Sequence, residues 1–212
     1  MPVTSATRFE AITSGKADLE CGSTTSNLER QKTVAFSPTF FVAGTKLLVR
    51  RGSPVRDYTQ LKGRKVAVTA GTTNEKTMQN LSQRLHLNLQ IMSMRDHAES
   101  FAQGASGAAD AFATDDVLLY GLIAETPNGR NLYSVVGDFL SYDPYGVMFR
   151  RDDPQFARLV TDAFQALAVD GEIARQYTRW FQRRLPSGQT LNLPMSPQLE
   201  VILESLAATQ KE

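Results

Sequence analysis

Cysteine is nearly absent from this sequence, because Cys21 is the only one among 212 residues. A single cysteine excludes a disulfide within the chain and any zinc site built from several thiolates. We expect Cys21 itself to be a small, buried residue at the end of a strand. Histidine is also scarce, since two residues are too few for a metal site made of several histidine ligands. We therefore expect neither a metal ion nor a cofactor.

A charge imbalance and long hydrophobic runs are missing as well. The 23 Lys and Arg residues nearly balance the 22 Asp and Glu residues, which gives a net charge of +1. Such a balance does not fit a nucleic-acid-binding protein, so we expect no nucleic-acid partner. No apolar run approaches the ~20 residues needed to span a bilayer. The first five residues have neither the charged nor the apolar segment of a signal peptide.

Short apolar runs instead alternate with longer stretches of helical periodicity, which predicts an α/β fold with largely parallel sheets. We expect strands at 17–21, 33–37, 40–50 with a break at Gly44, 65–69, 89–94, 109–113, 133–136 and 145–149. We expect helices at 28–32, 73–85, 98–103, from Asp115 or Asp116 to just before Pro127, 156–167, 173–181 and 197–206. The helix at 156–167 should bury one apolar stripe.

Two extended segments, 40–48 and 141–149, flank a self-contained α/β unit. A unit inserted between two extended strands is typical of a two-lobed protein with a double hinge. We therefore expect one lobe to consist of 1–44 and 145–212, and the inserted lobe to consist of 45–144. Ligands of such folds bind at the carboxyl ends of strands and the N-termini of helices.

Three predicted strands end in small hydroxyl or acidic residues directly before a helix, at 22–26, 71–73 and 114–116. The first two loops suit an anion such as a carboxylate or phosphate, because free N–H groups at a helix start attract negative charge. The third loop, with two acids, suits a cation. For any one of these loops taken alone, plain helix capping is the favoured interpretation. Arg30 lies one helical turn beyond Thr25, where a guanidinium is placed to grip a carboxylate.

Several of these segments resemble a known family. ECGSTTSNLER at 20–30, AFS at 35–37 and FF at 40–41 resemble the amino-acid-binding solute receptors of polar amino-acid importers. LKGRKVAVT at 61–69, with GTT at 71–73, resembles the start of their second lobe. Residues 96–97, 111–116, 145–146 and 150–156 resemble the glutamate/aspartate-binding subgroup. The resemblance covers nearly the whole chain and implies a type II periplasmic-binding-protein-like fold of two α/β lobes.

The resemblance also implies a function, which is to bind glutamate or aspartate in a cleft between the lobes and deliver it to the membrane permease of an ABC importer. It implies that Arg30 clamps the α-carboxylate of the ligand. Ser23 and Thr25 would supply contacts from lobe one, and Thr72 and Thr73 would donate from lobe two.

Four further residues complete the implied binding site. Asp115 would accept from the α-ammonium, while Ser5, Arg8 and His97 would meet the side-chain carboxylate of an acidic ligand. The ordinary alternatives are an N-cap for Ser5, a solvated helix charge for Arg8 and a surface position for His97. His86 matches no family position.

The chain departs from the family pattern at its start, because the pattern places a signal peptide and the first strands of lobe one before the equivalent of Ser5. We therefore expect a lobe one that lacks its first strands. The resemblance implies a periplasmic location, although this chain has no signal peptide. Sheet edges and apolar helix faces left open by missing strands attract a second copy, so we also expect a homodimer through the lobe-one edge.

Three other functions stay open at this point. An enzyme such as a cyclohexadienyl dehydratase can share the fold, but the candidate residues fit ligand charge pairing better than acid–base chemistry, so we expect no enzyme activity. A sensory ligand-binding module would usually adjoin a transmembrane segment. A non-binding remnant is the last alternative, because the expected lobe one is incomplete.

The first prediction concerns the distal carboxylate, whose desolvation in a cleft requires a compensating cation. Replacing Arg8 by Ala should lower the affinity for glutamate by far more than tenfold, where one tenfold step is about 1.4 kcal/mol. Isothermal titration calorimetry measures this change. An unchanged affinity would remove Arg8 from the site.

Overall fold

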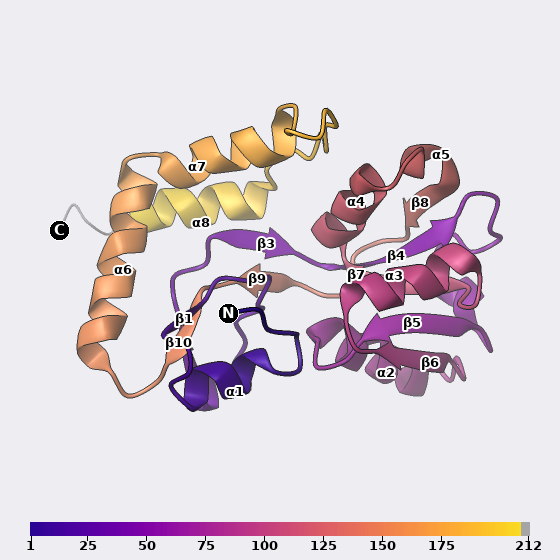
Figure 1. Ribbon diagram of the computed structural model, residues 1–212, viewed down its shortest axis with the longest axis horizontal. Helices are drawn as coiled ribbons and strands as arrows, with labels where there is room; N and C mark the ends of the chain where they lie inside the picture. Colours follow the sequence, from indigo (N-terminus) through magenta and orange to yellow (C-terminus); the bar gives the residue numbers. More distant parts are fainter. Residues whose placement is uncertain (209–212) are drawn as a thin grey trace. The chain divides into compact units, whose positions relative to one another are not determined.

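The computed structural model describes residues 1–208, and this part of the chain divides into two compact units (Figure 1). Unit one contains residues 7–42 and the chain from 144 onward, and unit two contains residues 2–6 and 43–143. The main chain therefore leaves unit one after residue 42 and returns to it after residue 143. Residues 2–6 lie with unit two, although the sequence led us to place them in lobe one.

Unit two is built around a five-stranded sheet with the order β6-β5-β7-β4-β8. Its strands are β4 (Thr45–Arg50), β5 (Lys65–Thr69), β6 (Gln90–Met94), β7 (Ala111–Asp115) and β8 (Tyr133–Val136). β5 runs parallel to β6 and β7, whereas β4 is antiparallel to both β7 and β8. Four strands thus share one direction and β4 alone is reversed. The expected parallel arrangement holds for this sheet except at β4. This strand directly follows one of the two crossing segments, which are the stretches at 42–43 and 143–144 where the main chain passes from one unit to the other.

The two faces of this sheet bury different residues, because successive side chains of a strand point to opposite faces. One face packs against α2 (Thr73–Arg84) through a core that includes Leu47, Val66, Val68 and Met78. The other face carries Leu48, Ala67 and Phe112 and packs against α3 (His97–Ser106) and α4 (Asp116–Glu125). Helices therefore cover both faces of the sheet, as expected for strands whose sequences are nearly continuous apolar runs. Two short helices complete the unit, the 3-10 helix η2 (Tyr58–Leu61) and α5 (Gly129–Leu132).

Unit one has a smaller, antiparallel sheet with the order β1-β10-β2. Its strands are β1 (Leu19–Glu20), β2 (Val34–Phe36) and β10 (Met148–Arg150), preceded by helix α1 (Arg8–Thr13). β1 and β2 both pair antiparallel with β10, so the expectation of parallel strands is wrong for this sheet. The core that these elements bury centres on Ile12, Val34 and Met148. The helix expected at 28–32 is only a 3-10 turn, η1 (Arg30–Lys32).

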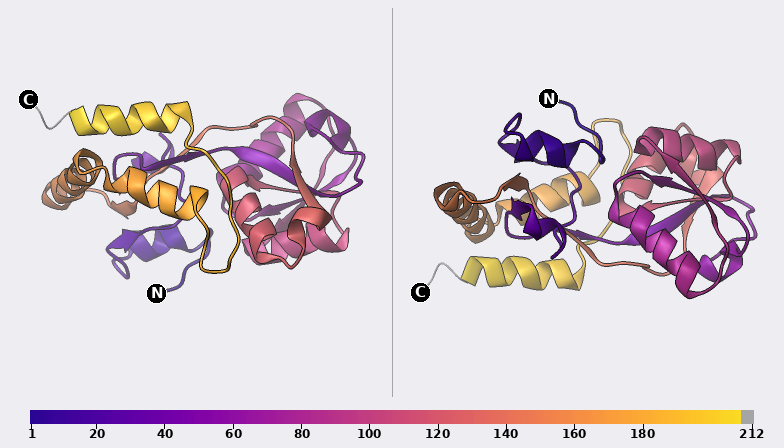
Figure 2. Two further views of the ribbon diagram at one scale, coloured as in Figure 1. Left: turned by 90° about the horizontal axis from the view of Figure 1, so that it is seen from above. Right: turned by 90° about the horizontal axis from the view of Figure 1, so that it is seen from below.

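Two further short strands, β3 (Phe41–Ala43) and β9 (Asp143–Tyr145), pair with each other where the chain changes unit. The C-terminal part of unit one is helical, with α6 (Pro154–Val169), α7 (Glu172–Tyr177), the π-helical turn η3 (Thr178–Gln182) and α8 (Pro197–Ala208). α6 packs against both α7 and α8 (Figure 2). Phe41 stacks on Tyr145 and Tyr177, with ring centroids 5.6 Å apart in each pair.

The structure corrects two sequence-based expectations about burial. The stripe expected on α6 is only partly covered, because Val160 is buried but Leu159 is 63% exposed. Cys21 is exposed rather than buried. Partial burial and the neighbouring Glu20 carboxylate raise the pKa of the Cys21 thiol, which disfavours the reactive thiolate. None of the helices described here is both long and apolar enough to cross a membrane.

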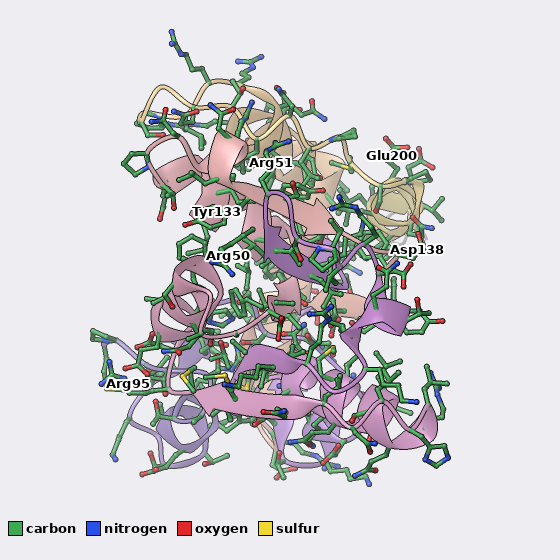
Figure 3. All side chains as sticks on the ribbon, turned by 90° about the vertical axis from the view of Figure 1, so that its right-hand side faces the viewer. Arg50, Arg51, Arg95, Tyr133, Asp138 and Glu200 are labelled. Carbon is green, nitrogen blue, oxygen red and sulfur yellow. The ribbon has the colours of Figure 1, made fainter. Side chains whose placement is uncertain are left out.

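Gly107, which ends α3 in the left-handed region with φ of +82°, generates a prediction about stability. A Cβ added there would overlap the guanidinium of Arg50, a flexible group on the outer end of β4, labelled in Figure 3. Replacing Gly107 by Ala should lower the free energy of unfolding by about 1 kcal/mol, chiefly because left-handed backbone is strained for alanine. Chemical denaturation measures the difference.

Gly121 provides the matched control for this experiment. It lies inside α4, and a Cβ added to it would meet no atom within 4 Å. Its replacement by Ala should raise the free energy of unfolding by about 0.5–1 kcal/mol, because alanine has the higher helix propensity. Equal effects at the two glycines would contradict the conformational argument.

Candidate functional site

The carboxyl ends of three strands in unit two meet at one edge of the sheet. β5, β6 and β7 are neighbours with the same direction, so their ends lie side by side. Each is followed within a few residues by a helix start, of α2, α3 and α4 respectively. This edge is where ligands of open α/β sheets bind. Four of the predicted site residues lie there: Thr72, Thr73, His97 and Asp115.

Thr72 is the N-cap of α2 and is buried. Its hydroxyl accepts a hydrogen bond from the Glu75 backbone N–H at 3.1 Å and donates to the Thr69 carbonyl at 2.7 Å. The Glu75 carboxylate in turn accepts from the N–H of Gly71, the residue before the N-cap, at 3.0 Å. The capping alternative therefore describes the Thr72 side chain. Thr73, the first helical residue, is half-buried.

Ser5 lies next to this same loop. Gly71 has a φ of +76°, and a Cβ added to it would stand 3.0 Å from the Ala6 Cα and 3.1 Å from the Ser5 carbonyl oxygen. The close approach places the backbone of residues 5–6 against the turn that precedes α2. Only glycine combines the positive φ with this contact. The Ser5 side chain is half-buried.

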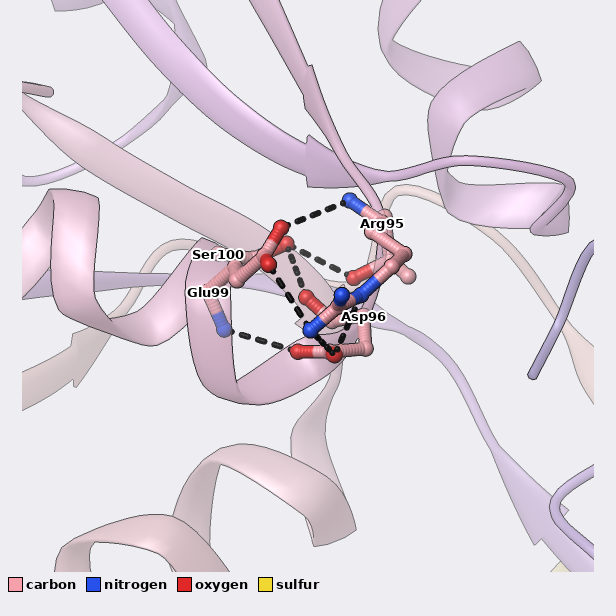
Figure 4. Close-up of polar contacts among 5 residues, drawn as sticks. Arg95, Asp96, Glu99 and Ser100 are labelled. Carbon is pink, nitrogen blue, oxygen red and sulfur yellow. Dashed lines mark hydrogen bonds and ion pairs between the residues drawn. The ribbon is translucent and has the colours of Figure 1, made fainter. Parts of the chain in front are cut away.

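His97 is the first residue of α3, and a dense set of hydrogen bonds fixes this helix start (Figure 4). Asp96 caps the helix by accepting from the Glu99 N–H at 2.9 Å, and Glu99 accepts from the Arg95 N–H at 3.2 Å. Hydrogen bonding from the Glu99 backbone lowers the pKa of Asp96. His97 itself is half-buried and presents its ring to Phe112, with centroids 6.5 Å apart.

Asp115 is a buried carboxylate, 3% exposed, at the end of β7. Although it occupies the N-cap position of α4, its side chain does not cap that helix. Its Oδ1 instead accepts a hydrogen bond from Asn74 Nδ2 at 2.7 Å. A buried carboxylate needs such donors or a cation to offset its desolvation. Sequence analysis did not identify Asn74, although its place directly after the Thr-Thr pair was visible.

The neighbouring Asp116 has a different role. Its backbone N–H donates to the Gly44 carbonyl at 3.0 Å, and its Oδ1 accepts from the Gly44 N–H at 3.4 Å. Burial raises the pKa of Asp116, and the Gly44 hydrogen bond offsets part of this effect. The sequence predicted that Asp115 or Asp116 caps the helix that follows. In the structure, the Asp115 side chain binds Asn74 and the Asp116 side chain binds Gly44.

Unit one contains a buried polar chain that runs through Arg8, on α1. Arg8 is 5% exposed, so the alternative of a solvated helix charge is wrong. Its Nη1 donates to the Thr24 hydroxyl at 2.6 Å and to the Ser23 carbonyl at 3.2 Å. Thr24 donates onward to the Glu20 carboxylate. Glu20 and Thr24 were not among the predicted site residues. Glu20 lies just before the predicted loop, but no pattern in the sequence marked it as buried.

Arg30 also binds this loop. Its Nη1 donates to the Thr25 carbonyl at 2.8 Å, and its guanidinium lies 5.1 Å from the centroid of the Phe9 ring. A cation over an aromatic face is an attractive contact. Thr25 is buried and forms a bridge to Tyr145, while Ser23 is half-buried. Unit one thus brings together four predicted residues: Arg8, Ser23, Thr25 and Arg30.

Metal binding finds no support in the part of the chain that the structure describes. Residues 1–208 contain no group of three or more His, Cys, Asp or Glu side chains that could hold a metal ion. The available groups are guanidinium, hydroxyl, imidazole and carboxylate, together with the N–H groups of helix starts. Guanidinium groups and the N–H groups of helix starts attract anions, and a buried carboxylate accepts from a cation such as an ammonium.

Comparison with protein families identifies the class. Residues 1–183 match the bacterial extracellular solute-binding proteins, family 3, and the chain belongs to this family. The type II periplasmic-binding-protein-like fold expected from the sequence is confirmed by the solved structures it resembles. One of them, an ancestral arginine-binding protein bound to arginine, has 27% identity and a TM-score of 0.78, over 85% of this chain and 79% of that chain.

Characterised relatives give the finer comparison. The chain is 38% identical over 205 residues to the glutamate/aspartate import solute-binding protein of Escherichia coli K12, covering 96% of this chain and 68% of the relative. It is 40% identical over 204 residues to the L-glutamate/L-aspartate-binding protein of Pseudomonas aeruginosa PAO1, covering 96% and 67%. A third similarity is to the ancestral amino-acid-binding protein AncCDT-1, described as a precursor of cyclohexadienyl dehydratase, with 28% identity and a TM-score of 0.72, over 85% of this chain and 76% of that chain.

The raised pKa of Asp116 leads to a prediction about pH. A group whose pKa is higher in the folded state binds more protons there, so stability is full below the unfolded pKa of about 3.9 and falls as pH rises through the folded pKa. Asp116→Asn keeps the acceptor for Gly44 and removes the titration. The melting temperature of this variant, relative to the parent, should therefore rise between pH 4 and pH 7.

The exposed Asp138 provides the control for this measurement (Figure 3). The Asp138→Asn variant should follow the parent across the same pH range, because its side chain is not buried. A constant difference between Asp116→Asn and the parent at every pH would show that burial does not govern the titration of Asp116.

Proposed function

We propose that this protein is the receptor of an ABC importer that binds an acidic L-amino acid, glutamate or aspartate, between its two lobes and delivers it to the membrane permease. The relatives that are 38–40% identical over 96% of the chain carry names that state this ligand class. The single observation that carries the proposal is the buried Asp115 carboxylate at the same sheet edge as Thr72, Thr73 and His97. One edge thereby offers an acceptor for an ammonium and donors for carboxylates.

In unit two, the ligand ammonium would donate to Asp115. The Thr72 hydroxyl is engaged in the helix cap, so the contacts from this loop to the α-carboxylate would come from backbone N–H groups and from Thr73. Helix starts favour such anions. Ser5 and His97 would face the side-chain carboxylate, with His97 held in place by the capped start of α3.

In unit one, the ligand would meet the loop that holds Ser23 and Thr25. Arg30 would clamp the α-carboxylate, and Arg8 would compensate the charge of the side-chain carboxylate. Two arginines next to one loop favour a ligand with more negative than positive charge. Glutamine and asparagine carry a neutral side-chain amide, which cannot pair with the charge of Arg8. They should therefore bind less tightly than glutamate and aspartate.

The remaining alternatives are weaker. The similarity to an ancestor of cyclohexadienyl dehydratase keeps an enzyme in view, but that ancestor is itself described as an amino-acid-binding protein, and we propose no catalytic activity. A sensory module and a non-binding remnant would share the same candidate site residues and differ in partner or in affinity. We also propose a periplasmic location, which membership of this family supports. The homodimer through the lobe-one edge stays a prediction.

A binding screen tests the proposed ligand. Glutamate and aspartate should bind at least tenfold more tightly than glutamine, asparagine or arginine in titration calorimetry, because only the acidic side chains pair with Arg8 and His97. Prephenate and arogenate should be left unchanged on incubation. Binding of none of these amino acids would contradict the proposal, and turnover of either cyclohexadiene would replace it with an enzyme.

The two histidines provide a matched pair of variants in the same screen. His97→Asn should weaken glutamate binding at least tenfold, because it removes the imidazole at the sheet edge. His86 is exposed, and His86→Asn should leave the affinity unchanged while keeping a residue that tolerates the positive φ of 51°. Equal affinities for the two variants would exclude His97 from the site.

A further inference from the structure

Asn74, the second residue of α2, stands between two buried oxygen acceptors in unit two. Its Nδ2 lies 2.7 Å from Asp115 Oδ1 and 2.7 Å from the Thr45 hydroxyl oxygen. An amide nitrogen has two protons, so each acceptor receives one. The Asn74 oxygen faces the Thr114 hydroxyl at 3.4 Å, which fixes the same orientation of the amide. The residue is 3% exposed, so water does not replace these bonds.

The hydrogen bonds continue beyond Thr45 in one direction. The Ser141 hydroxyl donates its single proton to Asp143 Oδ2. The 2.7 Å contact between the hydroxyls of Thr45 and Ser141 must then be donated by Thr45. The Thr45 backbone N–H also donates to Ser141 at 2.9 Å. The order of donation therefore runs from Asn74 through Thr45 and Ser141 to Asp143.

The two ends of this chain have distinct positions in the fold. Asp115 ends β7 at the ligand-binding edge, and β4 pairs Thr45 directly with it. Asp143 is 2% exposed and is the last residue of unit two before the chain returns to unit one. The polar chain thus spans from the proposed acceptor of the ligand ammonium to the point where the main chain leaves the unit.

We propose that Asn74 is a positioning residue for Asp115, and that Asn74, Thr45 and Ser141 form a relay that couples ligand binding at Asp115 to the crossing segment at Asp143. This proposal rests on the role given to Asp115 in the proposed function. Asn74 fixes the carboxylate by one amide proton and anchors it to the crossing segment by the other. Ser141 has no place in the ligand site, so any effect of Ser141 on affinity passes through the relay.

Three variants of the relay test the coupling in the intact chain. Asn74→Ala should weaken glutamate binding at least tenfold in calorimetry. Asn74→Asp keeps the shape of the side chain but not its two donors, and should weaken binding to a similar extent at neutral pH. Ser141→Ala should also weaken binding, by roughly three- to tenfold, although it lies three hydrogen bonds away from Asp115.

Controls on the same helix separate positioning from loss of stability. Leu81→Ala opens a cavity in the core beneath α2 and should lower the melting temperature while leaving the affinity within twofold of the parent, at a temperature where circular dichroism shows the variant folded. The exposed Asn80→Ala should change neither quantity appreciably. If Leu81→Ala weakens binding as much as Asn74→Ala, or if Ser141→Ala binds like the parent, the relay is excluded.

A ligand-free measurement distinguishes failure of the relay from failure of the proposed function. If the relay exists, the combined Asn74→Ala and Ser141→Ala variant should lose less in melting temperature than the sum of the single variants, because each substitution already breaks the same chain. If the melting-temperature changes are subadditive but the parent binds no amino acid, the ligand assignment and the role of Asn74 in binding are overturned. Full additivity would overturn the relay even if glutamate binds.

Discussion

The hydrogen bond from the Asn74 amide to the Asp115 carboxylate is the interaction on which the proposed ligand-binding edge of unit two depends. It lets a carboxylate stay buried at the end of a strand while its helix begins without using it as a cap. The second amide proton then ties the reversed strand β4 to the same point. The one antiparallel strand of this sheet is thus joined by a side chain to its parallel neighbours at the edge where a ligand would meet them.

In unit one, a side-chain hydrogen bond likewise stabilises buried charged groups. The Arg8 guanidinium and the Glu20 carboxylate are both buried, and the Thr24 hydroxyl stands between them as acceptor of one and donor to the other. A hydroxyl bridge compensates the two charges without the direct contact of an ion pair. It also leaves the arginine oriented by its helix and its loop together, which is a condition for recognising a carboxylate with fixed geometry.

Much of this arrangement was readable from the sequence because it is local. The run KVAVT followed by GTT gave β5 and the start of α2, since strand pattern and cap residues agree there. What could not be read depends on tertiary contacts. The direction of β4 is set by where the main chain enters unit two. The burial of Arg8 depends on its contact with Thr24, and the position of the Asn74 side chain depends on Thr45, which lies 29 residues earlier in the sequence. The exposure of Leu159 shows that an apolar stripe predicts which face of a helix is apolar. It does not predict which element packs against that face.

The unequal cores of the two units have a consequence for cooperativity. Unit two buries residues on both faces of a five-stranded sheet, whereas the sheet of unit one has a core centred on three side chains. Two compact units that each have a core of their own can unfold in separate steps. The double connection between the units, after residue 42 and after residue 143, means that local unfolding of one unit leaves its two ends held by the other.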